Sequence, residues 1–185
     1  MTRIATLWAA LAAALDRLAP DALPLLARLV FAGVLAGYFW ASAVTKLGDG
    51  IFSPSVGAYA QIFPRMLEVA GYDPAALGVF SRVVVVAGTW AEFVLPALIV
   101  LGLATRVAAL GMIGFIAVQS ITDIFGHLAE PETVGIWFDR VPDAMILDQR
   151  AFWVLTLLIL LLQGAGRLSL DRVLQGLIRP ITKAS

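Results

Sequence analysis

Four long apolar runs constrain this chain more than any other feature of its sequence. They cover residues 25–47, 79–103, 104–125 and 151–170. A helix needs about 20 mainly apolar residues to cross the hydrocarbon core of a bilayer. Of the 185 residues, 61% are hydrophobic and 14% charged, whereas soluble domains are closer to a quarter charged. We predict an all-α membrane protein whose core is a bundle of four transmembrane helices.

The regions outside the bundle are short. Residues 1–24 predict an amphipathic helix at the membrane interface, because polar residues gather on one side of a helical wheel with Trp8 opposite. A signal peptide is the weaker interpretation, since the first residues carry a single arginine and no clear cleavage site follows. We expect one membrane domain over residues 25–174, a tail over 175–185, and short helices in the outer loops 48–78 and 126–150.

Lysine and arginine are distributed unevenly between the two predicted membrane faces. Eight lie on the side of the termini and five on the other, which predicts that both termini are cytoplasmic. The eight are Arg3, Arg17, Arg28, Arg106, Arg167, Arg172, Arg179 and Lys183, and the five are Lys46, Arg65, Arg82, Arg140 and Arg150.

Several functions are excluded by what the sequence lacks. With no cysteine, the chain cannot form a disulfide, ligate an iron–sulfur cluster or relay electrons through thiols. Its single histidine cannot supply both axial ligands of a haem. The formal net charge is zero, which gives no electrostatic basis for binding nucleic acid.

Glu92 is the strongest candidate for a functional residue, because it lies near the middle of an apolar run. Ionisable residues at this depth are costly and usually face a partner, a cavity or a reaction path. Pro96 removes the hydrogen bond that the Glu92 carbonyl would accept. Glu92 could relay a proton or bind a polar ligand head; alternatively, a protonated Glu92 bonded to Gln119 or Ser120 would only hold helices together. Both interpretations remain open.

The depth of these residues follows from the predicted hairpin that turns near Ala104. Residues at equal distances from the turn lie at similar depth, so Gln119 is within about half a turn of Glu92 at 1.5 Å rise per residue. Trp90 would contribute to an aromatic slot beside them. Arg82 and Lys46 would lie near the outer mouth of such a site.

A second candidate site lies closer to the outer face. Asp123 and His127 are four residues apart on one face of the third predicted helix, a spacing that suits a divalent metal or a carboxylate that orients an imidazole. The acidic loop that follows would have to supply the other ligands. The alternative is a salt bridge between Asp123 and Arg82, with His127 capping the helix.

A stripe of small residues marks the first predicted helix. Gly33, Gly37 and Ala41 recur every four residues, a pattern typical of close helix packing in membranes. We expect this stripe to pack helices together or to form a homo-oligomer.

Three stretches of the chain resemble the DoxX family of small four-helix membrane proteins. They are residues 92–110 (EFVLPALIVLGLATRVAAL), residues 164–171 (GAGRLSLD), and Ala27-Arg-Leu-Val together with Lys46-Leu. The resemblance covers roughly residues 25–174. It implies a four-helix bundle in the cytoplasmic membrane of a bacterium, with Glu92, Arg106 and Asp171 at the family's polar positions. Pro96 and the long acidic loop depart from the family pattern.

The resemblance also implies an association with membrane redox complexes, because the family takes its name from a quinone-reducing thiosulfate oxidoreductase. Our leading hypothesis is a quinone-interacting subunit of a membrane oxidoreductase, in which Glu92 is the catalytic proton partner and another protein holds the second redox centre. Gln119, Trp90, Arg82 and Lys46 would complete the quinone site. The alternatives are a metal-handling or stress-protection protein that uses Asp123 and His127, and a non-catalytic membrane scaffold for a redox or periplasmic partner. Whether the chain is itself an enzyme stays open.

Overall fold

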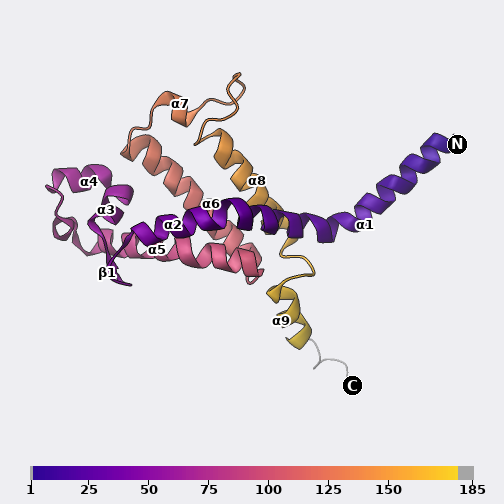
Figure 1. The fold of residues 1–185 in the computed structure, drawn as a ribbon, viewed down its shortest axis with the longest axis horizontal. Coiled ribbons are helices and arrows are strands. Elements are labelled where there is room, and N and C mark those ends of the chain that lie inside the picture. Colours follow the sequence, from indigo (N-terminus) through magenta and orange to yellow (C-terminus); the bar gives the residue numbers. More distant parts are fainter. Residues whose placement is uncertain (1, 179–185) are drawn as a thin grey trace.

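Four long helical segments pack side by side and run in alternating directions (Figure 1). They are seen in a computed structural model that describes residues 2–178. The first segment comprises α1 (Arg3–Phe31), the π-helical η1 (Ala32–Ala36) and α2 (Gly37–Thr45); the others are α5 (Gly78–Leu101), α6 (Thr105–Ile121) with the π-helical η3 (Thr122–Gly126), and α8 (Asp148–Gln163). The first segment contacts α5 and α8, and α6 contacts the same two helices, so the four form a closed ring.

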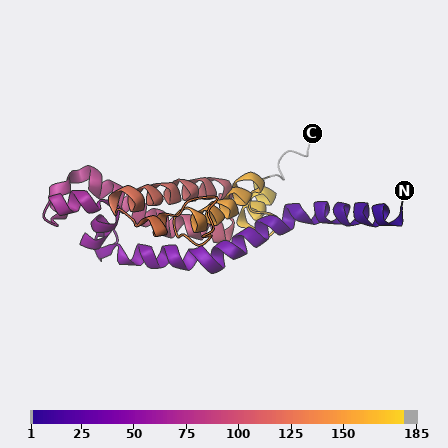
Figure 2. The ribbon, with the colours of Figure 1, turned by 90° about the horizontal axis from the view of Figure 1, so that it is seen from above.

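The two ends of the bundle are built differently. One end, here called the loop end, carries an antiparallel pair of strands, short helices and α7 (Pro131–Val134) (Figures 1 and 2). Its elements are β1 (Leu47–Gly50), β2 (Ser53–Pro54), α3 (Val56–Ile62), α4 (Pro64–Val69) and the 3₁₀ helix η2 (Pro74–Leu77). The strands pair Leu47 with Pro54 and Gly50 with Ser53. Proline occupies the first position of α4, η2 and α7, where its missing N–H costs nothing. The strand pair was not predicted.

The opposite end, here called the turn end, holds the turn between α5 and α6 and the short helix α9 (Leu170–Ile178). Asp171 fixes this turn: its carboxylate accepts hydrogen bonds from the backbone N–H groups of Ala104 (2.7 Å) and Thr105 (3.0 Å). These donors lie at the start of α6 and have no partner within the helix. Gly102 has a positive φ of 67°, and a Cβ there would lie 2.7 Å from the Cβ of Ser169. Glycine is therefore required at this turn.

Arg28 fastens the turn end to the first helical segment. Its guanidinium donates to the carbonyl oxygens of Ile99 (3.1 Å) and Val100 (2.7 Å) at the end of α5. It also donates to the carbonyls of Ala165 (3.2 Å) and Leu168 in the segment that leads to α9. The motifs that resemble the family's first helix, tight turn and ending therefore meet here, where they satisfy the free backbone groups of helix ends.

Three helical segments of the described chain are long and apolar enough to cross a membrane: Arg3–Thr45, Pro74–Leu101 and Thr105–Gly126. The fourth predicted span, 151–170, differs from the helix observed. α8 begins at Asp148 and ends after 16 residues, because the chain turns at Gly164 with a φ of 84°. At 1.5 Å per residue this helix is about 24 Å long, less than the roughly 30 Å of a hydrocarbon core.

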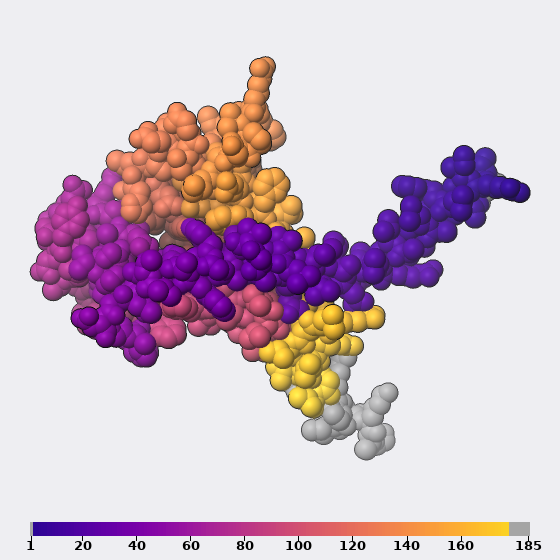
Figure 3. Space-filling model, viewed as in Figure 1, coloured from indigo at the N-terminus to yellow at the C-terminus, as the bar shows by residue number. Residues whose placement is uncertain are grey.

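The N-terminal segment is continuous with the first span. The helix does not break at the predicted boundary between residues 24 and 25, although Pro20 and Pro24 lie within α1. Its first part projects beyond the bundle, uncovered by other segments in this view (Figure 3). Ile4, Leu7 and Trp8 are among its exposed apolar side chains. Its placement at a membrane interface stays a prediction, and residues 179–185 of the predicted tail lie outside the described chain.

Two apolar cores hold the bundle. The larger lies toward the turn end and includes Phe31, Phe39, Ile99, Met112 and Leu157, all fully buried. The smaller packs the loop end onto α5 and consists of Ala58, Tyr59, Leu67 and Val85. The part of α5 between Val85 and Ile99 also faces a cavity, which contains the candidate site.

The stripe of small residues is not used for packing within the bundle. Gly33, Gly37 and Ala41 are exposed, and a Cβ added at either glycine would meet no atom within 4 Å. Homo-oligomerisation through this stripe stays a prediction.

Candidate functional site

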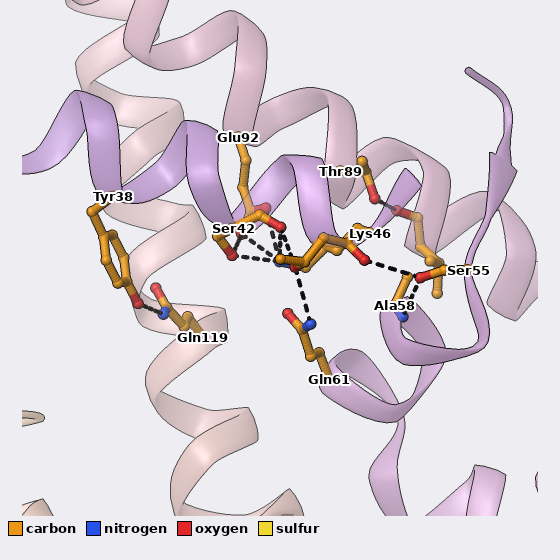
Figure 4. A network of polar contacts seen from close by, with 11 residues as sticks. Tyr38, Ser42, Lys46, Ser55, Ala58, Gln61, Thr89, Glu92 and Gln119 are labelled. Carbon is orange, nitrogen blue, oxygen red and sulfur yellow. Dashed lines mark hydrogen bonds and ion pairs between the residues drawn. The ribbon is translucent and has the colours of Figure 1, made fainter. Parts of the chain in front are cut away.

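Glu92 forms a buried ion pair with Lys46 (Figure 4). The Lys46 Nζ lies 2.8 Å from Oε2 and 3.0 Å from Oε1 of Glu92. Ser42, one helical turn before Lys46, donates to Oε1 at 3.2 Å and accepts from Nζ at 2.6 Å. The Lys46 and Glu92 side chains are only 5% and 4% exposed. The carboxylate, the ammonium and the hydroxyl thus satisfy one another away from solvent.

The predicted partners of Glu92 were wrong. Gln119 instead donates from Nε2 to the hydroxyl of Tyr38 at 2.9 Å, in a separate contact visible in Figure 4. Ser120 donates to the carbonyl of Ile116 at 2.8 Å. Counting residues from the hairpin turn gives depth but not rotation about the helix axis, and Glu92 faces α2 rather than α6. The signal for the true partner was Lys46, a basic residue at the end of the first apolar run.

Helix α5 continues through Pro96, which is buried. The carbonyl of Phe93, one residue beyond Glu92, accepts a hydrogen bond from the indole of Trp40 at 3.1 Å. A side chain from the neighbouring helix thus binds a backbone group next to the Glu92 carbonyl that Pro96 leaves without its helical donor.

The ion pair lies in the wall of a cavity of about 740 Å³ between α2, α5 and α6, capped by residues of the loop end. Its polar lining includes Tyr38, Ser42, Lys46, Gln61, Glu92 and Gln119. Small residues also line the cavity on α5 and α6: Ala87, Gly88, Ala91, Gly111 and Gly114. A Cβ added at Gly114 would meet no atom within 4 Å. The cavity is therefore mainly apolar, with one polar cluster around Glu92.

A second ion pair lines the same cavity nearer the loop end. The Arg150 Nη2 lies 2.5 Å from an oxygen of Asp123, and its Nη1 donates to Ser120 at 2.8 Å. Arg150 is 5% exposed, and its Nε has no partner within residues 2–178. Asp123 lies in η3, and π-helical turns often occur at functional sites. The predicted alternative of an Asp123–Arg82 bridge was wrong, because Arg150 occupies that position and Arg82 is exposed.

Two residues predicted for the quinone site do not line this cavity: Trp90 and Arg82. Trp90 donates from its indole to the carbonyl of Ile51 at 3.1 Å and packs its ring against Phe52 and Phe93. Residues two positions apart on a helix point in nearly opposite directions, so Trp90 faces away when Glu92 faces inward. Trp90 instead helps to fasten the strand pair to α5.

The residues around Asp123 and His127 do not fit a metal centre. His127 lines the cavity, and its Nε2 lies 3.0 Å from the carbonyl oxygen of Gln61. The part of the chain that the structure describes contains no group of three acidic or histidine side chains able to hold a metal. Acidic residues of the following loop bind their own backbone: Asp139 accepts from Val141 and Asp148 from Ala144.

The fold and the site define an α-helical membrane protein with a paired acid and base in the wall of a cavity between its helices. A comparison with known sequence families matches residues 23–123 to DoxX, which is more than half of the chain. The chain therefore belongs to the DoxX family. The match includes Lys46, Glu92 and Gln119, and ends before the motif at residues 164–171. Searches of curated proteins and of solved structures found no match.

Proposed function

We propose that this DoxX-family protein binds a quinone in the cavity beside Glu92 and Lys46, as a subunit of a membrane oxidoreductase system. The observation that carries the proposal is a cavity of about 740 Å³ with a buried acid–base pair in its wall. Ligand pockets are commonly 300–1,000 Å³, mostly apolar, with a few polar groups that orient the ligand.

The polar wall suits the head of a quinone. Quinone carbonyls accept hydrogen bonds, and the wall offers a donor in the hydroxyl of Tyr38, whose oxygen accepts from Gln119 while its hydrogen is free among the described residues. Gly114 on α6 leaves space for a flat ring, since a Cβ there would meet no atom within 4 Å. These features suit the binding of an amphipathic carbonyl compound.

The chemistry that a bound quinone supplies is reversible reduction to a quinol, with two electrons and two protons. The residues of this chain can hold and transfer the protons: Glu92 is the acid or base, and Lys46 and Ser42 keep its carboxylate oriented. Asp123 and His127 line the same cavity toward the loop end and would extend a polar path from Glu92. Because the chain has no cysteine, we infer that a partner protein supplies the electrons.

We further propose that α8 is the fourth crossing and that both termini are cytoplasmic, in a bacterial inner membrane. α8 packs along α1 and α6, both parts of longer apolar spans. The excess of lysine and arginine on the side of the termini, eight against five, supports this orientation.

The alternatives have less support. A scaffold without a ligand predicts a filled interior around Glu92, which the cavity opposes, although the carboxylate itself is fully paired. Metal handling at Asp123 and His127 lacks further ligands within residues 2–178 and has Arg150 already bound to Asp123.

The test uses a glycine substitution that fills the cavity. Gly114→Leu places a side chain in the open space and should weaken binding of a short-chain ubiquinone analogue by tenfold or more. Gly37→Leu is the matched control, because Gly37 also has free space but lies outside the cavity. Binding is measured in detergent by quenching of tryptophan fluorescence. Equal affinity of wild type and Gly114→Leu would contradict the proposal, as would unchanged binding and quinone-linked activity in Glu92→Gln.

A further inference from the structure

A second cavity lies at the turn end, far along the bundle from the Glu92 site. It measures about 490 Å³ and is bounded by the start of α6, the segment between α8 and α9, and Asp21 of α1. Three arginines line it: Arg106, Arg167 and Arg172. The proposed function does not use any of these residues.

The acidic residues of this cavity do not neutralise the arginines. Asp21 pairs with Arg167 at 3.1 Å. Asp171 directs both carboxylate oxygens to the N–H groups that begin α6. Within the described chain, Arg106 and Arg172 have no carboxylate within salt-bridge distance. The cavity wall therefore carries two guanidinium groups that are free to bind an anion.

A buried hydroxyl points to the same kind of ligand. Thr105 lines the cavity and is 1% exposed, yet its Oγ1 has no hydrogen-bond partner among residues 2–178. Buried polar atoms are rarely left unpaired, because each one costs free energy. Its Oγ1 is a donor that an anion in the cavity would satisfy. The neighbouring backbone N–H groups are already bound by Asp171, so side chains would make the contacts.

We propose that this cavity binds a phosphate group through Arg106, Arg172 and the Thr105 hydroxyl. The guanidinium fork matches phosphate oxygens in geometry and charge. The phosphate can belong to an anionic phospholipid or be a soluble ion. The surroundings favour the lipid: α9 lines the cavity with Arg172 and Gln175, while its apolar Val173 and Leu177 are exposed, as expected beside acyl chains.

The experiment measures binding of two phosphate sources to the full chain in detergent. Native mass spectrometry quantifies phosphatidylglycerol adducts, with diacylglycerol as the phosphate-free comparison. Thermal unfolding in inorganic phosphate against chloride at equal ionic strength measures the soluble source. We expect phosphatidylglycerol to bind and diacylglycerol not to; stabilisation by inorganic phosphate would support the same site with a soluble ligand.

Variants locate the binding. Arg106→Gln combined with Arg172→Gln should weaken phosphatidylglycerol binding about tenfold or more, and Thr105→Val should weaken it less. Arg17→Gln is the matched control, an exposed arginine on α1 outside the cavity, and should change affinity by less than twofold. The variants should fold, because the replaced arginines are exposed. Far-UV circular dichroism verifies this. The proposal would be overturned if the double variant bound phosphatidylglycerol with wild-type affinity, or if Arg17→Gln lost as much affinity as the double variant. It would also be overturned if phosphatidylglycerol bound no better than diacylglycerol and inorganic phosphate gave no stabilisation over chloride.

Discussion

Removing one partner of the Lys46–Glu92 pair should destabilise the bundle at least as much as removing both. At an effective dielectric constant of about 20, unit charges about 4 Å apart attract by about 4 kcal/mol. Both side chains are about 95% buried, so solvent cannot replace a lost partner. Breaking a buried pair by removing one member typically costs about 3–5 kcal/mol, because the other charge is left unpaired.

We therefore expect Lys46→Met and Glu92→Gln each to lower the free energy of unfolding by about 3 kcal/mol. The double variant should lose no more than either single variant, which gives a coupling of about 3 kcal/mol or more. Unfolding is measured in detergent micelles with increasing dodecyl sulfate, followed by far-UV circular dichroism. The exposed pair of Arg167 and Asp21 is the control, where each change should cost less than about 1 kcal/mol. Single losses below about 1 kcal/mol at Lys46 and Glu92, or additive losses in the double variant, would refute the pairing.

Three further predictions concern the supports of the bundle. Gly102→Ala should destabilise by about 2 kcal/mol or more, because a Cβ meets Ser169 at positive φ, whereas Gly176→Ala should not; thermal unfolding measures both. Asp171→Ala should cost about 1–2 kcal/mol through the lost α6 cap, and a melting temperature equal to wild type would count against that role. Arg150→Met should lower the free energy of unfolding by about 3 kcal/mol, and adding Asp123→Asn should restore part of the loss. The denaturant midpoints of the single and the double variant measure both effects.

The sequence predicted the helices well because their signal is local. A long apolar run identifies a membrane helix without reference to its neighbours, so α5 and α6 lie close to their predicted bounds. The fourth helix ends earlier than its predicted bound, because its end is set by the positive φ of Gly164. Hydrophobicity alone does not indicate such a turn. At the N-terminus, α1 continues through Pro20 and Pro24, so the amphipathic segment 1–24 and the first span form one helix.

The candidate site was harder to predict because it depends on how helices are rotated against one another. Glu92 was identified because an ionisable side chain is costly to place within an apolar run. Lys46 was named as a quinone-site residue near the outer mouth, but not as the partner of Glu92. Their pairing requires the face of α5 that carries Glu92 to meet α2, and hairpin depth contains no information about rotation. Arg150 was missed for a similar reason: it lies in the first turn of the fourth helix, where a basic residue is also expected at a membrane surface.

The most direct test of the quinone site is to locate a bound quinone by photolabelling. The full chain in lipid nanodiscs is irradiated with an azido-quinone analogue, and labelled peptides are identified by mass spectrometry, with unlabelled quinone as competitor. We predict competable labelling within residues 84–95 and 111–122, which line the cavity, and its loss in Gly114→Leu. Labelling confined to the outward face with Gly33 and Gly37, or unaffected by Gly114→Leu, would contradict a quinone site beside Glu92.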